Sequence, residues 1–158
     1  MSKYATKASE NIFYKARSEA ARYNDRLSSR EGAAEELGID RTRLANIELD
    51  NIKPYPEEVN MMADAYRAPE LRNYYCTAMC PLGFCIPKAE IGDLDRVTLK
   101  TLGALKEIEK ARELLISITE DGIISEEERS DLEKILDTLE QVGQAAASLK
   151  IWVEKNLR

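Results

Sequence analysis

The chain has 158 residues, of which 33% are charged, and a net charge of −6, which suits one medium domain or two small ones. It contains no histidine, the commonest general base, and no Gly-rich phosphate loop or nucleophile elbow, so we expect no enzymatic activity. The polar start Met1-Ser2-Lys3-Tyr4 and the lack of an apolar run of about 18 residues argue against an export signal or membrane span. Three cysteines in such a chain favour a reducing cytoplasm and free thiols.

The charge is unevenly distributed along the chain. Residues 1–54 carry ten basic and nine acidic side chains, whereas residues 88–158 carry eleven basic and sixteen acidic side chains. The acidity therefore belongs to the C-terminal half, and the N-terminal half can still present a basic face to a nucleic acid.

Five helices are predicted before residue 77. The first covers residues 9–24, with Ser9 as its N-cap. The second starts at residues 28–29, where both serines are good caps, and ends at Gly38, since glycine adopts the left-handed conformation of a helix end. Asp40 caps a third helix over residues 41–49. The fourth and fifth cover residues 57–67 and 70–76, with Pro69 in the first turn of the fifth.

The second and third of these helices are joined by a turn of about four residues that contains Gly38, which is the arrangement of a helix-turn-helix. The stretch from residue 29 to residue 54 resembles the Cro/phage-repressor (XRE-type) helix-turn-helix family. The matching residues are Ser29, Ala34, Leu37, Gly38, Ile39, Arg41, Leu44, Ile47, Glu48 and Pro54.

Two positions depart from the family pattern. Asp50-Asn51 stand where the family usually has a glycine, although both residue types tolerate left-handed backbone better than most. Gly32 lies inside the second helix, where it lowers helix propensity by up to ~1 kcal/mol relative to alanine.

The resemblance implies sequence-specific binding to double-stranded DNA, with the third helix in the major groove. It places Arg41, Thr42 and Asn46 at base-reading positions. Arginine suits the O6 and N7 acceptors of guanine, and asparagine suits the N6 and N7 groups of adenine. Contacts to phosphate are then expected from Ser29, Arg30, Arg43 and Lys53.

Two long amphipathic helices are predicted over residues 94–118 and 126–156, each with an apolar stripe. Their connection contains Gly122 as a turn residue and Ser125 as a cap, with Glu128 three residues later, so the pair forms an antiparallel hairpin. The stripes are Leu94, Val97, Leu102, Leu105, Ile108, Ala111, Leu115 and Ile118 in the first helix, and Leu132, Ile135, Leu139, Val142, Ala146, Leu149 and Val153 in the second.

The predicted fold is all-α: a five-helix repressor-like domain (1–75), a cysteine-containing linker (76–90) and a helical hairpin (91–158). The hairpin cannot bury both apolar faces alone, so we expect a homodimer through residues 91–158. Cys76, Cys80 and Cys85 lie close in sequence but lack a histidine as fourth ligand, which favours packing over a metal site, and we expect no cofactor.

These features predict a cytoplasmic DNA-binding regulator of transcription, acting as a dimeric repressor on a palindromic operator. No membrane contact and no small-molecule ligand are indicated. Two alternatives stay open: a DNA-binding antitoxin whose hairpin holds a partner protein, and a metal- or redox-responsive regulator that uses the cysteine cluster.

Overall fold

The computed structural model describes residues 8–120 and 122–157, and within these ranges every regular element is a helix. The chain divides into two compact units at the bond between Ile86 and Pro87, here called the N-terminal and C-terminal units. This bond lies within the segment 76–90 that the sequence indicates as a linker. Residues 1–7 of the first predicted domain, Asp121 of the predicted turn and Arg158 lie outside the described residues.

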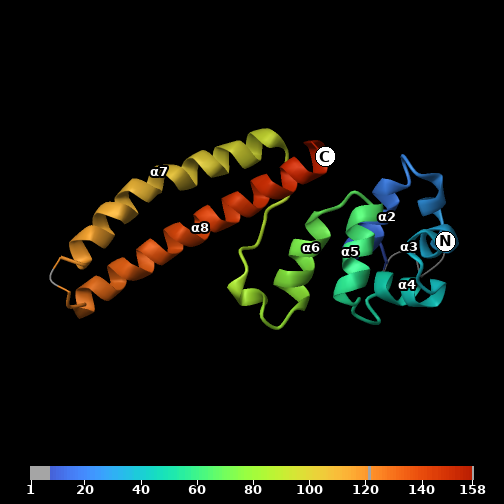
Figure 1. The fold of residues 1–158 in the computed structure, drawn as a ribbon, viewed down its shortest axis with the longest axis horizontal. Coiled ribbons are helices and arrows are strands. Elements are labelled where there is room, and N and C mark those ends of the chain that lie inside the picture. The colour runs from blue at the N-terminus through green and yellow to red at the C-terminus, as the bar shows by residue number, and fades with distance from the viewer. Residues whose placement is uncertain (1–7, 121, 158) are drawn as a thin grey trace. The chain divides into compact units, whose positions relative to one another are not determined.

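The N-terminal unit contains five α-helices within its described residues, followed by two short helical turns (Figure 1). The helices are α2 (Ile12–Ala20), α3 (Arg30–Leu37), α4 (Arg41–Glu48), α5 (Pro56–Ala65) and α6 (Glu70–Tyr74). The 3-10 turn η1 (Asp25–Ser28) precedes α3, and the π-helical turn η2 (Tyr75–Met79) and the 3-10 turn η3 (Gly83–Cys85) follow α6.

Helix caps account for most of the helix boundaries in this unit. Ser29 caps α3 by accepting a hydrogen bond from the Gly32 amide, and Asp40 caps α4 by accepting from the Arg43 amide, as the sequence predicts. The cap predicted for the first helix is wrong: α2 begins after Asn11, whose side chain accepts from the Tyr14 amide. Ser9 lies before that cap.

The core of the N-terminal unit is closed and apolar. Five large side chains from α2, η1, α4, α5 and α6 are at most 1% exposed, and small alanines from α2 and α3 let these helices approach closely. The five are Phe13, Leu27, Leu44, Met62 and Leu71. The unit therefore has a closed apolar core of its own.

Gly32 is explained by close packing. A Cβ at this position would lie 2.2 Å from the carbonyl oxygen of Arg26, so the backbone of η1 approaches α3 where a side chain would stand. The sequence marks Gly32 as a helix-weakening departure, and the structure gives it a packing role.

Part of the predicted connection between the two domains is helical and packs on the N-terminal unit. Met79 of η2 contacts the core. Gly83 is buried, and a Cβ there would lie 2.3 Å from the carbonyl oxygen of Cys76. Residues 76–86 thus belong to the N-terminal unit, while Leu82 and Phe84 remain 68% and 85% exposed.

The C-terminal unit is a long antiparallel hairpin of α7 (Leu94–Ile118) and α8 (Glu126–Leu157), which lie side by side in Figure 1. The predicted turn chemistry is present. Gly122 has a φ of 72°, the Glu128 amide donates to Ser125 Oγ, and the Glu128 carboxylate accepts from the Ser125 amide. The ends of both helices are close to those predicted.

The residues that join α7 to α8 differ from the predicted stripes. Val97, Ala111, Ile118 and Ile135 of those stripes are buried, but so are two alanines of the seam outside the stripes, Ala104 and Ala145. Ser148 is also buried, beside the seam, where its Oγ accepts from the Glu90 amide. Of the seven leucines of the stripes, Leu132 is half-buried, and the other six are 36–59% exposed: Leu94, Leu102, Leu105, Leu115, Leu139 and Leu149. The predicted stripes therefore combine the seam of the hairpin with a second, uncovered apolar surface.

Candidate nucleic-acid interface

Helices α3 and α4 are joined by a tight turn that follows the predicted pattern (Figure 1). Gly38 has a φ of 65°, in the left-handed region, and its amide bonds to the carbonyl of Glu35. The Ile39 amide then donates to the carbonyl of Ala34 at 3.0 Å. These two bonds satisfy carbonyls at the end of α3 and redirect the chain into α4.

Helix α4 is buried on one side and exposed at its N-terminal turn. Leu44 and Ile47 are 0% and 1% exposed and face the core, whereas Arg41 and Thr42 are exposed. Arg41 Nε lies 2.6 Å from Glu31 Oε1 of α3, with both side chains more than 60% exposed. Such a surface pair contributes little stability, so a ligand that offers an anion or acceptor can displace Glu31 at small cost.

Asn46 lies four residues after Thr42, on the same side of α4. It is half-buried, and its Oδ1 accepts a hydrogen bond from Asn51 Nδ2 at 3.0 Å. Asp50 adopts a φ of 57°, the left-handed conformation that the sequence indicates for this turn. Asn11 Nδ2 fixes the turn by donating to the carbonyl of Ile47 at 3.0 Å and to Asp50 Oδ1 at 2.8 Å.

Glu48, the last residue of α4, is fully buried and bonded to two arginines. Its Oε1 accepts from Arg17 Nε at 2.5 Å, and its Oε2 accepts from Arg30 Nε at 2.6 Å. Arg17 also donates to the carbonyl of Leu27 at 2.8 Å. This buried cluster ties α2, η1, α3 and α4 together, and it restricts the guanidinium of Arg30, whose side chain is 30% exposed.

Arg43 is held in a similar way on the other side of α4. Its guanidinium makes two hydrogen bonds to the buried carboxylate of Glu58 and lies over the ring of Tyr55, 4.2 Å from the ring centroid. Burial alone would raise the pKa of Glu58. The hydrogen bonds from Arg43 and from the Tyr55 amide, together with the charge of Arg43, outweigh it, so the pKa of Glu58 is below its usual value.

The two remaining predicted phosphate contacts are exposed. Ser29 stands at the start of α3, where its Oγ accepts from the Gly32 amide at 3.0 Å. Lys53 follows α4, and its Nζ donates to the carbonyl of Met79 at 3.3 Å. Both can bind an anion with little rearrangement of the backbone.

The seven predicted site residues thus fall into three groups, of which Asn46 alone forms one: it is half-buried and bonded to Asn51. Arg41, Thr42, Ser29 and Lys53 are exposed, while Arg30 and Arg43 are anchored by Glu48 and Glu58. Tyr55 is an exposed candidate that the sequence interpretation missed, with 61% of its surface open beside Arg43. Its position between Pro54 and Pro56, directly after the helix-turn-helix, is the signal that could have indicated it.

The cysteines form no recognisable ligand set. Cys76 and Cys80 are half-buried and Cys85 is exposed, all three as free thiols. In the described ranges, no three His, Cys, Asp or Glu side chains are grouped so that they could hold a metal ion. A search of the same residues finds no helix long and apolar enough to cross a membrane.

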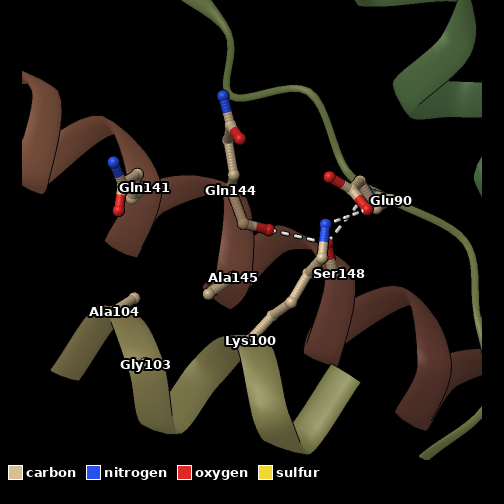
Figure 2. Close-up of a pocket in the computed structure, with 8 residues that line it drawn as sticks. All are labelled: Glu90, Lys100, Gly103, Ala104, Gln141, Gln144, Ala145 and Ser148. Atoms are coloured by element: carbon tan, nitrogen blue, oxygen red, sulfur yellow. Dashed lines mark hydrogen bonds and ion pairs between the residues drawn. The ribbon is translucent and has the colours of Figure 1, made fainter. Parts of the chain in front are cut away.

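The C-terminal unit has a groove, lined by both polar and small apolar residues, that the sequence does not indicate (Figure 2). It encloses about 350 Å³ between α7, α8 and the segment that precedes α7. Gly103, Ala104 and Ala145 leave space there because their side chains are small or absent. At its edge the Glu90 carboxylate pairs with Lys100, and the Glu90 amide donates to Ser148 Oγ at 2.9 Å.

Comparison with protein-family models, with curated proteins and with solved structures finds no match to this chain.

Proposed function

We propose that the N-terminal unit binds double-stranded DNA by inserting α4 into the major groove. The observation that carries the proposal is the position of Arg41 and Thr42: they are exposed on the first turn of a short helix whose other side is fixed in the core by Leu44 and Ile47. A rigid helix with exposed polar residues at its N-terminal end is what a helix-turn-helix presents to base edges. Arg41 would read guanine, and Thr42 and Asn46 the neighbouring bases.

The charges around α4 support contacts to phosphate on both sides of it. Ser29 and Lys53 are exposed. Arg30 and Arg43 are oriented by buried carboxylates and are 30% and 28% exposed, and each guanidinium has further N–H groups to donate. Anchored arginines lose less conformational entropy on binding than free ones, which favours contact with the DNA backbone.

A single unit with these few contacts binds DNA weakly at physiological salt, so the proposed regulator is a homodimer on two half-sites. Its chain would act in the cytoplasm as a repressor of transcription, without enzymatic activity. The C-terminal unit supports the dimer because it leaves several leucines at least one third exposed.

The test is binding of the full chain to a fluorescent DNA duplex at several salt concentrations. We expect affinity to fall as salt rises, because bound counterions are released from DNA. Lys53→Ala should weaken binding to all sequences and reduce the slope of log K against log salt by about 1.

Arg41→Ala is the specificity variant, and its expected effect is a loss of about 1–3 kcal/mol of discrimination against the wrong base. Arg129→Ala on α8 is the matched control, since it removes the same charge from an exposed position in the other unit. Binding that does not respond to salt, or equal effects of Arg41→Ala and Arg129→Ala, would contradict the proposal.

A further inference from the structure

Five of the exposed leucines of the C-terminal unit lie on one face of the hairpin. In α7 the buried seam residues Val97, Ala104, Ala111 and Ile118 repeat every seven positions. A residue one or four positions after a seam residue points to one side of the seam, and a residue three or six positions after it points to the other side, because each residue turns the helix by about 100°.

The first side is mainly apolar in both helices, although in α7 it also carries Thr98 and Arg112, each one position after a seam residue. It contains Leu105 and Leu115, one and four positions after seam residues of α7. It also contains Leu136, Leu139, Ala146 and Leu149, one and four positions after Ile135 and Ala145 of α8. Because α7 and α8 are antiparallel, residues with the same offset from a seam residue lie on the same face of the hairpin in both helices. We call these six residues the leucine face; its five leucines are between 36% and 63% exposed.

The second side is polar and partly covered. Lys100 and Gly103 lie three and six positions after Val97, and they line the groove of Figure 2 together with Gln141 and Ser148 of α8. The segment before α7 crosses this side, where Glu90 bonds to Ser148 and pairs with Lys100. Within the C-terminal unit, therefore, one face is partly covered by the chain itself and the opposite face is mainly apolar.

The charges of the hairpin differ between its two ends. Residues 107–140, the half next to the turn, carry twelve acidic and four basic side chains. The rest of the unit, residues 87–106 and 141–158, carries four acidic and seven basic side chains. The hairpin thus has an acidic turn end and a basic open end, and the leucine face extends across both halves.

We propose that a second copy of this chain packs on the leucine face with its hairpin antiparallel to the first. This deepens the proposed function and rests on the homodimer named there. In a two-fold antiparallel pair, α8 crosses α8 of the partner, and each acidic turn end lies over a basic open end. A parallel pair would instead place α8 over the partner's α7 and bring the two acidic ends together.

The size of the face suits such a dimer. A helix of 25 residues is about 38 Å long and about 10 Å wide, so two adjacent helices present roughly 750 Å². Standard protein interfaces bury about 800 Å² per partner. Four helices around a leucine core also form a familiar arrangement, the four-helix bundle.

The first experiment measures the mass of the full chain by sedimentation at micromolar concentration. We expect a dimer for the native chain and a monomer for the double variant Leu105→Ser/Leu139→Ser. Leu99→Ser is the matched control: Leu99 is 72% exposed but lies two positions after Val97, on the outer side of α7. Because all three leucines are exposed, helix content should be unchanged. A monomeric native chain, or a dimer that survives the double variant, would overturn the proposal.

The second experiment tests orientation by oxidative cross-linking of chains whose three native cysteines are serine. Each chain carries one new cysteine, and two kinds of chain are mixed. An antiparallel pair predicts cross-linking between Leu136→Cys and Leu149→Cys chains, because these positions lie equally far from the middle of the apolar row of α8. A parallel pair predicts cross-linking between Leu136→Cys and Arg112→Cys chains and would overturn the proposal, as would the absence of cross-links in both mixtures.

These outcomes are independent of DNA binding. Arg41→Ala added to the cysteine variants should leave the cross-linking pattern unchanged. If the antiparallel dimer forms but the chain does not bind DNA, the proposed function fails while this inference holds. If DNA is bound by a monomer, the proposed DNA contact of α4 holds while this inference fails.

Discussion

The two units of the molecule solve the same packing problem in different ways. The N-terminal unit closes a core around large side chains such as Phe13, Leu44 and Met62, and it ties its helices together through the buried Glu48. The C-terminal unit joins its helices through small residues such as Ala104 and Ala145 and leaves larger ones exposed. The comparison shows one unit with a closed core of large side chains, although Leu82 and Phe84 stay exposed on it, and one unit whose larger apolar side chains lie mostly on its surface.

The largest loss of stability is expected when the buried carboxylate of Glu48 is removed from the N-terminal unit. Glu48→Ala leaves Arg17 and Arg30 without their partner, and Arg17 is only 4% exposed. We expect a loss of about 3–5 kcal/mol in the free energy of unfolding, measured by urea denaturation. Glu31→Ala, which breaks an exposed pair with Arg41, is the control and should cost less than about 1 kcal/mol. Similar losses in both variants would refute the structural role of Glu48.

Two glycines compare the tightness of packing in the two units directly. At Gly32 an added Cβ meets the backbone of Arg26, so Gly32→Ala should destabilise the chain by about 1–3 kcal/mol. At Gly103, inside α7, an added Cβ meets nothing within 4 Å, so Gly103→Ala should raise helix stability by up to about 1 kcal/mol. Thermal unfolding followed by circular dichroism measures both, and effects of equal sign would contradict the comparison.

The ion pair between Arg43 and Glu58 makes the stability of the N-terminal unit depend on acidity. Because the pKa of Glu58 is lowered in the folded state, its contribution is present above the ordinary pKa of about 4.3 and is lost as pH falls through the folded value. Glu58→Gln should therefore destabilise the chain at neutral pH, by less than Glu48→Ala, and flatten the acid side of the stability profile. Urea titrations of the native chain and of Glu58→Gln from neutral to acid pH measure this effect. If the free energy of unfolding depends on pH in the same way in both, the predicted role of Glu58 is excluded.

The smallest expected effect concerns Tyr66, which is 2% exposed. Its hydroxyl has no hydrogen-bond partner among the described residues, and burial raises the pKa of this phenol. Tyr66→Phe removes a polar group that is desolvated without compensation, so it should change stability by about 0–1 kcal/mol in the favourable direction. A clear loss of stability in urea titration would mean that the hydroxyl is satisfied in solution.

Local signals predicted the starts of α3, α4 and α8 well, whereas the first helix, predicted over residues 9–24, covers only Ile12–Ala20. Ser29, Gly38 and Asp40 act through their own backbone neighbourhood, and so does the pair of Ser125 and Glu128, which is why their roles could be read from the sequence. The missed cap at the first helix has a tertiary cause, since Asn11 also bonds to Ile47 and Asp50, which are far away in sequence.

The burial of single residues and the pairing of charged ones could not be predicted from the sequence, because both depend on which side of a helix packs against another helix. Leu139 and Ile135 belong to one predicted stripe, yet Ile135 is 4% exposed and Leu139 is 50% exposed. Likewise, the sequence predicts Arg30 and Arg43 as phosphate contacts but not their pairing with Glu48 and Glu58, because these partners are 18 and 15 residues away. The spacing of residues indicates which of them share a helix face, but only the packing of the helices determines which of them are buried.

The central claim is that the N-terminal unit binds specific DNA sequences and that the hairpin joins two chains into a dimer. The most direct test selects bound duplexes from random DNA with the full chain. The account predicts enrichment of a motif with two-fold symmetry, and a change of base preference within each half-site when Arg41→Ala is used. Failure to enrich any sequence, or enrichment that Arg41→Ala does not alter, would contradict it.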